Sequence, residues 1–354
     1  LKEHGLKVTL YGRKLSTSMD LEIDGIKVIR KKLLFTKGPL FYAYFNIRLF
    51  FFLLMNRHSL ILSNDLDTLL ACKIASRISG CKIIYDSHEY FTGVPEIRER
   101  KTVQKVWKLI ERSCLPECDL VYTVNDSIAR LYKEEYNRFI GVVRNVPDVS
   151  PDLFSNKDKV SIRKKLGLPL EHQLVILQGA GINIERGAEE AVASMHHTEG
   201  IILLIIGGGD VVDVLRETVE NEKLGNKVIF IPKQPYDELL QYTAASDLGI
   251  TFDKDTNINY RYSLPNKLFD YIICRVPVLA SDLPEIRKVI DQYDIGSFIE
   301  NHDSIHIAQK MMEALKEQGR YQKWITNLNK AAEELNWPQE KKVMLKLIDD
   351  HAWT

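Results

Sequence analysis

Short apolar runs alternate with longer segments of helical periodicity along the whole chain. In the first half, apolar runs predict strands at residues 7–11, 26–30, 60–63, 82–86, 120–124 and 141–144. Between them, residues 66–79 and 103–113 have the spacing of amphipathic helices. Strands separated by helices favour a parallel sheet covered on both faces, and such sheets bind ligands at the carboxyl ends of their strands.

The second half starts the same alternation again. Apolar runs predict strands at 174–177, 201–206, 227–231, 248–252, 278–280 and 296–299, and helices from 302 to 334 and from 338 to 351. Between the halves, Asn145-Val146-Pro147-Asp148 has the composition of a linker. The pattern predicts an α/β protein with two domains, residues 1–147 and 148–335, and a terminal segment 336–354.

Charge supports this division. The 354 residues are 45% hydrophobic and carry 48 basic and 48 acidic side chains, so there is no overall attraction to nucleic acid. Residues 1–150 hold 24 Lys and Arg against 17 Asp and Glu, whereas residues 151–354 hold 24 against 31. The chain opens on Leu1-Lys2-Glu3-His4-Gly5, which has the pattern of a helix end, and we expect a leading strand and most of a helix to be missing from the sequence.

One stretch of the first half raises the question of a membrane. Residues 40–55 are strongly apolar, but they number only 16 and include Asn46 and Arg48, so we expect a helix packed on the sheet rather than a bilayer span. The cations Arg30, Lys31, Lys32 and Lys37 precede it, and peripheral contact with an anionic membrane is the alternative.

The five cysteines are odd in number and scattered, which indicates a reducing compartment. Cys114 and Cys118 have no second pair and no nearby His, so no metal site is predicted.

The stretch 263–281 carries the most informative chemistry. Pro265 is suited to the first turn of a helix, and Lys267 and Asp270 follow on one face near its N-terminus, beside Asn266 and Leu268. A cation, a carboxylate and free backbone donors can together hold a diphosphate and the hydroxyls of a ribose. Taken alone, the segment favours a surface helix that carries one ion pair, and it is the rest of the chain that favours the binding site.

Other candidate residues follow predicted strands. Gly179 and Gly181 lie between a strand and a helix, where backbone N–H groups can approach a phosphate and Arg186 can add a charge contact. We expect Gly207 and Pro232, which follow the next two strands, to contribute to the same site. In the first half, His88 and Glu89 follow a strand and are candidates for contacting a sugar, although a structural His–Glu pair fits equally well.

Taken together, these motifs resemble the retaining, nucleotide-sugar-dependent glycosyltransferases of family 4, which have the two-Rossmann-domain (GT-B) fold. The resemblance rests on four segments, namely Asp86-Ser87-His88-Glu89, Arg144-Asn145-Val146-Pro147, the Gly179–Gly187 loop and, most specifically, Pro265-Asn266-Lys267-Leu268-Phe269-Asp270-Tyr271 with Val276-Pro277-Val278. It implies two parallel sheets facing an interdomain cleft, acceptor binding by the first domain, donor binding by the second, and a terminal helix that crosses back to the first domain.

The resemblance also implies roles for single residues. Asp270 would hold the ribose hydroxyls, Lys267 and Arg186 would stabilise the diphosphate leaving group, and His88 would lie near the reacting sugar. Asp270 matches the second acid of a pair in the family, and at the position of the first acid, eight residues earlier, this chain has Tyr262. The implied activity is sugar transfer in bacterial surface polysaccharide or glycolipid synthesis, in the cytoplasm or at the inner face of the membrane, with no metal and no cofactor beyond the donor. A nucleotide-sugar epimerase of the same fold and a non-catalytic nucleotide-sugar-binding relative are the alternatives.

Overall fold

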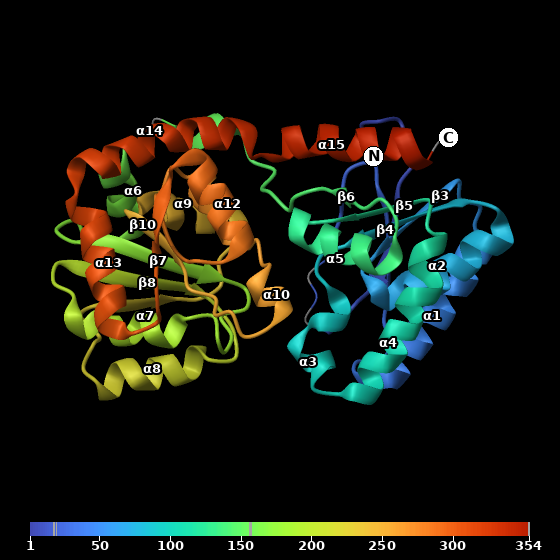
Figure 1. The fold of residues 1–354 in the computed structure, drawn as a ribbon, viewed down its shortest axis with the longest axis horizontal. Helices are drawn as coiled ribbons and strands as arrows, with labels where there is room; N and C mark the ends of the chain where they lie inside the picture. Colours follow the sequence, from blue (N-terminus) through green and yellow to red (C-terminus); the bar gives the residue numbers. More distant parts are fainter. Residues whose placement is uncertain (17, 19, 156–157, 353–354) are drawn as a thin grey trace. The chain divides into compact units, whose positions relative to one another are not determined.

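The computed structural model describes residues 1–16, 18, 20–155 and 158–352, and it divides the chain into two compact units (Figure 1). Unit 1 consists of Leu1–Val143 with Lys342–Thr354, and unit 2 consists of Arg144–Lys341. Both are built from parallel strands with helices between them, so the predicted α/β fold class is confirmed.

Unit 1 contains a two-stranded sheet, β1-β2, and a four-stranded sheet of order β3-β4-β5-β6, and every pairing in both is parallel. Its elements are β1 Thr9–Arg13, β2 Lys27–Lys31, α1 Gly38–Met55, β3 Leu60–Asn64, α2 Leu66–Ser79, β4 Lys82–Ser87, α3 Pro95–Arg98, α4 Lys101–Cys114, β5 Leu120–Thr123, α5 Asp126–Tyr136 and β6 Gly141–Val142. The strand predicted at 141–144 is shorter than expected, because β6 contains only Gly141 and Val142. The helix α15 (Trp337–Ala352) ends in this unit, where Leu347 lies against Gly141 of β6.

Helix α1 is longer and more exposed than the sequence indicated. It has 18 residues, and by length and composition it could cross a membrane. Of these residues, 22% are buried inside the structure. Phe41, Phe45, Leu49 and Leu53 form its buried side, so part of the helix packs into unit 1 as expected. The expectation that this segment is too short to span a bilayer is not upheld by its length and composition.

Unit 2 is organised around one six-stranded parallel sheet of order β12-β11-β10-β7-β8-β9. Its elements are α6 Lys159–Leu166, β7 Gln173–Gly179, α7 Ala188–Ser194, β8 Ile201–Gly207, α8 Val212–Asn221, β9 Val228–Ile231, α9 Tyr236–Ala245, β10 Leu248–Thr251, α10 Ile258–Arg261, α11 Asn266–Ile273, β11 Val278–Ser281, α12 Pro284–Tyr293, β12 Gly296–Ile299, α13 Ser304–Lys316 and α14 Gln318–Glu334. Along β7 the side chains alternate between two cores: Leu174 and Ile176 belong to one, and Val175 and Leu177 belong to the other. Helices therefore cover both faces of the sheet.

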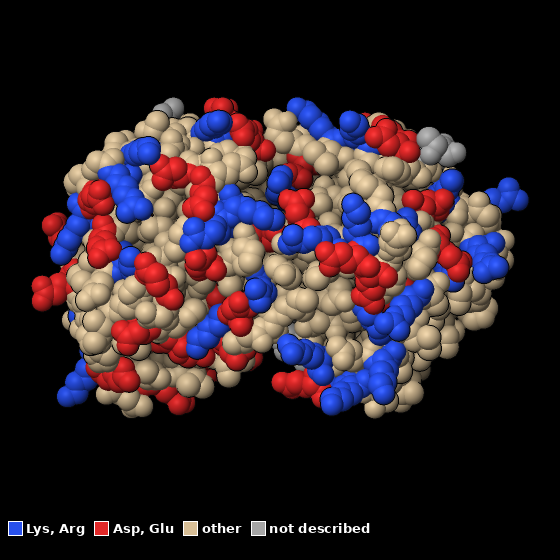
Figure 2. All heavy atoms as spheres, in the orientation of Figure 1, with Lys and Arg blue, Asp and Glu red and all other residues tan. Residues whose placement is uncertain are grey.

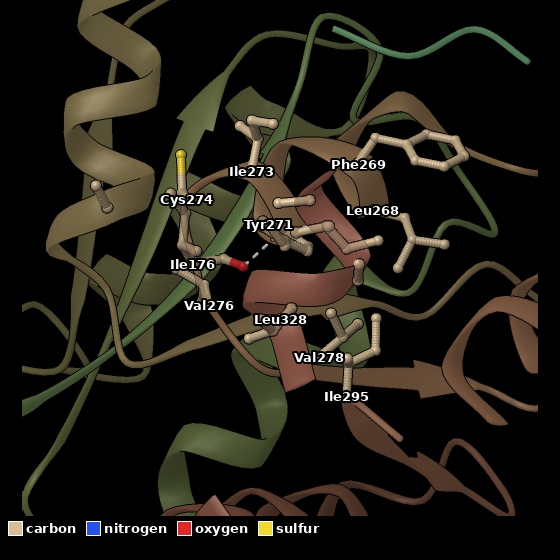
Figure 3. Close-up of a cluster of buried hydrophobic side chains, with 14 of the residues drawn as sticks. Ile176, Leu268, Phe269, Tyr271, Ile273, Cys274, Val276, Val278, Ile295 and Leu328 are labelled. Atoms are coloured by element: carbon tan, nitrogen blue, oxygen red, sulfur yellow. Dashed lines mark hydrogen bonds between the residues drawn. The ribbon is translucent and has the colours of Figure 1, made fainter. Parts of the chain in front are cut away.

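Helix α11 is fixed in the first of these cores. Leu268, Phe269 and Tyr271 are fully buried in it (Figure 3). The ring of Tyr271 lies so close to Gly249 of β10 that a Cβ there would be only 2.5 Å from it. The Tyr271 hydroxyl is 3.1 Å from the Ile176 carbonyl oxygen. The helix therefore cannot rotate without breaking these contacts, and this fixes the direction of the residues in its first turn.

Candidate functional site

A pocket of about 360 Å³ lies in unit 2, where the loop after β7 meets the start of α11. Five of the predicted donor-binding residues line it: Gly179, Gly181, Arg186, Asn266 and Lys267. No donor-binding role was predicted for the remaining lining residues, which are Leu177, Gln178, Ala180, Ile182, Asn183 and Pro265. Most of these residues were predictable from the sequence, because they belong to the same glycine-containing loop as Gly179 and Gly181.

The glycines of the neighbouring strand ends shape this loop. A Cβ on Gly207 would lie 1.9 Å from the carbonyl oxygen of Gly179, and Gly207 has φ +128°, a conformation that side chains disfavour. The Ile182 N–H donates to the Gly208 carbonyl at 2.9 Å. We expected Gly207 to contribute to the site directly, but it does not line the pocket. Instead, it allows the ends of β7 and β8 to approach closely enough to form the loop that lines the pocket.

Two cations face this pocket. Lys267 is the second residue of α11, which begins at Asn266, and Pro265 precedes the helix rather than starting it. Burial lowers the pKa of the Lys267 ammonium, Asp253 counteracts this by raising it, and the nearby Arg186 charge lowers it further. The Arg186 guanidinium lies 5.0 Å from the centre of the Tyr260 ring. The two cations repel each other in a partly dehydrated pocket, which favours binding of an anion.

Asp270, the predicted ribose ligand, lies behind the pocket rather than in its lining. It is 6% exposed, and its two oxygens accept hydrogen bonds from the Tyr236 hydroxyl at 2.7 Å and from Gln178 Nε2 at 2.9 Å. Burial raises the pKa of this carboxyl to about 6, while the bonds from Tyr236 and Gln178 lower it. Gln178 lines the pocket and therefore connects Asp270 to the pocket lining.

Two other predicted donor-binding residues lie apart from the pocket lining. The Leu268 side chain is fully buried in the hydrophobic core, because it occupies the inner side of α11. Pro232, which follows β9, is exposed, and its carbonyl accepts a hydrogen bond from Gln234 Nε2 at 2.9 Å.

In unit 1, His88 lies directly after β4 and is held by two carboxylates. Its Nδ1 is 3.4 Å from Asp65 Oδ2 and its Nε2 is 3.6 Å from Asp86 Oδ1, while its backbone N–H donates to Asp65 Oδ1 at 3.2 Å. The bond to Asp65 raises the pKa of the His88 imidazole to about 9. Asp65 itself has φ 59°, a backbone conformation that is costly for a residue with a side chain. The neighbouring Glu89 is exposed, and its backbone carbonyl accepts a hydrogen bond from Ser87 at 2.8 Å.

Metal ligands do not gather in the part of the chain that the structure describes, where no group of three or more His, Cys, Asp or Glu could hold an ion. Cys114 and Cys118 are buried free thiols, and the Cys118 thiol donates to the Cys114 carbonyl.

The segment that contains the pocket matches a known protein family. Residues 158–331 match the family model described as "Glycosyl transferases group 1". This range includes every residue that lines the pocket as well as Asp253 and Asp270. Residues 158–331 are therefore similar to glycosyl transferases group 1.

Two curated proteins are similar in sequence. One is chitobiosyldiphosphodolichol beta-mannosyltransferase of Candida albicans, 25% identical over 227 residues, which are 59% of this chain and 48% of that protein. The other is N-acetyl-alpha-D-glucosaminyl L-malate synthase of Bacillus anthracis, 23% identical over 208 residues, which are 58% of this chain and 52% of that protein. The matches thus extend over about half the length of these relatives.

Solved structures share the fold. Sucrose-phosphate synthase from Thermosynechococcus elongatus has a TM-score of 0.78 at 17% identity, with coverage of 99% of this chain and 90% of that one. HepE from Anabaena, in complex with UDP and glucose, has a TM-score of 0.72 at 16% identity, with coverage of 92% and 86%. At this identity the likeness concerns the fold, which is of the GT-B type.

Proposed function

We propose that this protein is a retaining glycosyltransferase of family 4 that moves a sugar from a nucleoside diphosphate to an acceptor hydroxyl. The observation that carries the proposal is the convergence of Lys267 and Arg186 on one pocket beside the Gly179–Gly181 loop. Two cations and free backbone N–H groups suit a diphosphate. The match to glycosyltransferase group 1 over this domain, and the names of both similar proteins, support a sugar as the transferred group.

In the proposed reaction, the bond between the sugar's anomeric carbon and the diphosphate oxygen breaks. The acceptor oxygen bonds to the same carbon on the same face, and its proton passes to an oxygen of the departing diphosphate. Negative charge grows on the diphosphate as the bond breaks, so Lys267 and Arg186 stabilise the transition state more than the bound donor. No divalent ion is needed if these two cations neutralise that charge, and we expect transfer to persist in the presence of EDTA.

Asp270 and His88 have supporting roles in this scheme. An ionised Asp270 accepts hydrogen bonds from ribose hydroxyls, which replace or join those from Tyr236 and Gln178. With a pKa of about 9, His88 carries a proton at neutral pH. It can therefore donate a hydrogen bond to a substrate oxygen but cannot act as a general base there.

Product analysis tests the proposal against its alternatives. The protein is incubated with UDP-, GDP- and ADP-sugars, and the products are separated by liquid chromatography with mass detection. Release of the nucleoside diphosphate with transfer or hydrolysis of the sugar is expected, and the acceptor product should keep the anomeric configuration of the donor. A free epimer would identify an epimerase, and tight binding without turnover would identify a non-catalytic relative.

The proposed setting is surface polysaccharide or glycolipid synthesis in the cytoplasm, with unit 1 in contact with the inner face of a membrane. The exposed side of α1 supports this, because it is apolar along its length, with Leu40, Ile47, Phe51 and Leu54 spaced three to seven residues apart. Helix α2 packs against both α1 and α4, and it adds Ile74 and Ile78 to the exposed apolar surface.

Helix α4, which packs against α2, carries positive charge. Lys and Arg side chains gather over α3 and α4 in Figure 2, and the exposed cations there include Arg100, Lys101, Lys105 and Arg112. Unit 1 as a whole has 25 Lys and Arg against 18 Asp and Glu. Apolar side chains with cations beside them are complementary to an anionic lipid surface.

Vesicle flotation tests the membrane contact. Vesicles of phosphatidylcholine with phosphatidylglycerol should carry the protein upward, and vesicles of phosphatidylcholine alone should carry much less. The combined change Leu40→Asn, Ile47→Asn and Phe51→Asn should abolish flotation, whereas Val160→Asn, at an exposed apolar position of α6, should not. Equal flotation of both variants would contradict the contact through α1.

A further inference from the structure

Asp253 is a buried carboxylate that has no hydrogen-bond partner among the described residues. It lies two residues beyond the end of β10 and has no exposed surface. Among the described residues, neither of its oxygens accepts a hydrogen bond, and no ion pair within 4.0 Å involves it. A buried charge with no hydrogen bond is costly, and such groups usually persist for a functional reason.

The position of Asp253 is fixed beside the pocket. Its neighbour Phe252 lies against the loop that carries Arg186, so closely that a Cβ on Gly187 would clash with the Phe252 carbonyl group. The Lys254 N–H donates to the Glu185 carbonyl at 3.0 Å. Asp253 also raises the pKa of Lys267, which lines the pocket. The carboxylate therefore lies near the cationic end of the pocket without forming a direct ion pair there.

Alternation along β10 places Asp253 on the side of α11. Leu248, Ile250 and Phe252 belong to the core on the opposite face of the sheet, and Tyr271 of α11 covers Gly249 on the near face. The Thr251 hydroxyl, on that near side, is also buried without a hydrogen-bond partner in the described structure. A second unpartnered hydroxyl, that of Ser263, precedes α11.

The chemistry of these groups selects the part of the donor that they can bind. Phosphate oxygens are negative acceptors, so a carboxylate repels them, whereas sugar hydroxyls donate hydrogen bonds that a carboxylate accepts well. We propose that Asp253 accepts hydrogen bonds from hydroxyl groups of the transferred sugar, with Thr251 on the same side of β10, and so determines which sugar the pocket takes. This role of Asp253 rests on the proposed function.

The alternative role is that of a counter-ion which only holds Lys267 in place. The two roles differ in what the change Asp253→Asn does to two ligands. If Asp253 binds the sugar, the variant loses affinity for the nucleotide sugar but keeps its affinity for the nucleoside diphosphate. If Asp253 only positions Lys267, both affinities change equally.

Isothermal titration calorimetry measures both affinities. UDP-glucose, GDP-mannose and ADP-glucose are screened by thermal shift, and the best of them is titrated together with its own nucleoside diphosphate. We expect Asp253→Asn to weaken the nucleotide sugar about 10- to 100-fold, as for loss of hydrogen bonds to a charged group, with the diphosphate unchanged or slightly tighter. The matched control is Asp255→Asn, an exposed carboxylate of the same loop that lies 3.9 Å from Arg261, and it should change neither affinity.

Two further measurements keep the result interpretable. The melting temperature of Asp253→Asn should equal or exceed that of the wild type, because the change removes a buried unpaired charge. Deoxy-sugar analogues should bind the wild type at least 10-fold more weakly than the parent at one hydroxyl, and Asp253→Asn should not discriminate at that hydroxyl. If Asp253→Asn fails to fold, Asp253→Glu is used instead. It keeps the charge on a side chain that is one methylene longer, and it should also lose affinity for the nucleotide sugar but not for the nucleoside diphosphate.

The outcomes separate the two claims. A wild type that neither binds nor turns over any nucleotide sugar refutes the proposed function. A wild type that transfers sugar, with a variant that loses both ligands equally or neither, refutes only the role of Asp253.

Discussion

The charge of Lys267 is expected to determine the rate of sugar transfer. Replacing it by methionine keeps most of the side-chain volume and removes the ammonium from a partly exposed position that α11 holds against the pocket. Electrostatic contacts are stronger where water is excluded, and the lowered pKa of Lys267 reports such surroundings. We expect Lys267→Met to reduce kcat by about 10²- to 10³-fold, or about 3 to 4 kcal/mol of transition-state stabilisation.

The kinetic signature of Lys267→Met is as informative as its size. Because negative charge on the diphosphate grows as the glycosidic bond breaks, kcat should fall more than donor affinity. Raising the pH should neutralise Lys267 below the usual lysine pKa of 10.5, so wild-type activity should decline on the alkaline side. In Lys267→Arg that decline should move to higher pH, because a guanidinium stays charged.

The assay is steady-state release of the nucleoside diphosphate, with folding checked by the melting temperature. Lys165→Met removes an exposed lysine of α6 and serves as the control, with unchanged kinetics expected. Unchanged turnover in a folded Lys267→Met protein, or an equal decrease in the control, would refute the proposed role of Lys267.

Three other perturbations have expected outcomes. NMR titration should give His88 a pKa near 9, and Asp65→Asn should bring this pKa toward 6.5. Because the folded protein binds this proton more tightly than the unfolded chain, the associated stability is complete below about pH 6.5 and is lost as the pH rises through 9. A wild-type His88 pKa near 6.5 would contradict the contact with Asp65. Nucleotide affinity should weaken as the pH falls through about 6, where Asp270 becomes protonated. Calorimetry should find no such pH dependence in Asp270→Asn. A wild-type nucleotide affinity that does not change with pH would exclude Asp270 from the site. Gly207→Ala should lower the free energy of unfolding in urea by about 2 kcal/mol or more and impair nucleotide binding. Gly208→Ala, where a Cβ meets nothing within 4 Å, should be close to neutral. Equal effects of the two changes would contradict the steric argument.

The sequence was sufficient for most of the fold because burial in parallel sheets leaves a direct pattern. Continuous apolar runs such as 201–206 are β8 almost to the residue, since both faces of that strand are covered. The convergence of Lys267 with the Gly179–Gly181 loop was likewise predictable, because the carboxyl ends of parallel strands meet at one edge of a sheet.

The parts that could not be predicted depend on contacts distant in sequence. Tyr236 and Gln178 reach Asp270 from 34 and 92 residues away, and nothing local in the chain marks either pair. The isolation of Asp253 is visible only when every neighbouring group has been placed. The exposed side of α1 was hidden for another reason: that helix is apolar all round, so periodicity could not separate its buried side from its exposed one.

The central claim is that the pocket of unit 2 binds a nucleoside diphosphate through Lys267. A thermal-shift measurement with UDP, GDP and ADP at millimolar concentration, on the wild type and on Lys267→Met, tests it most directly. At least one of the three should raise the melting temperature of the wild type by several degrees and that of the variant by much less. No shift of the wild type with any of them, or equal shifts of both proteins, would contradict the claim.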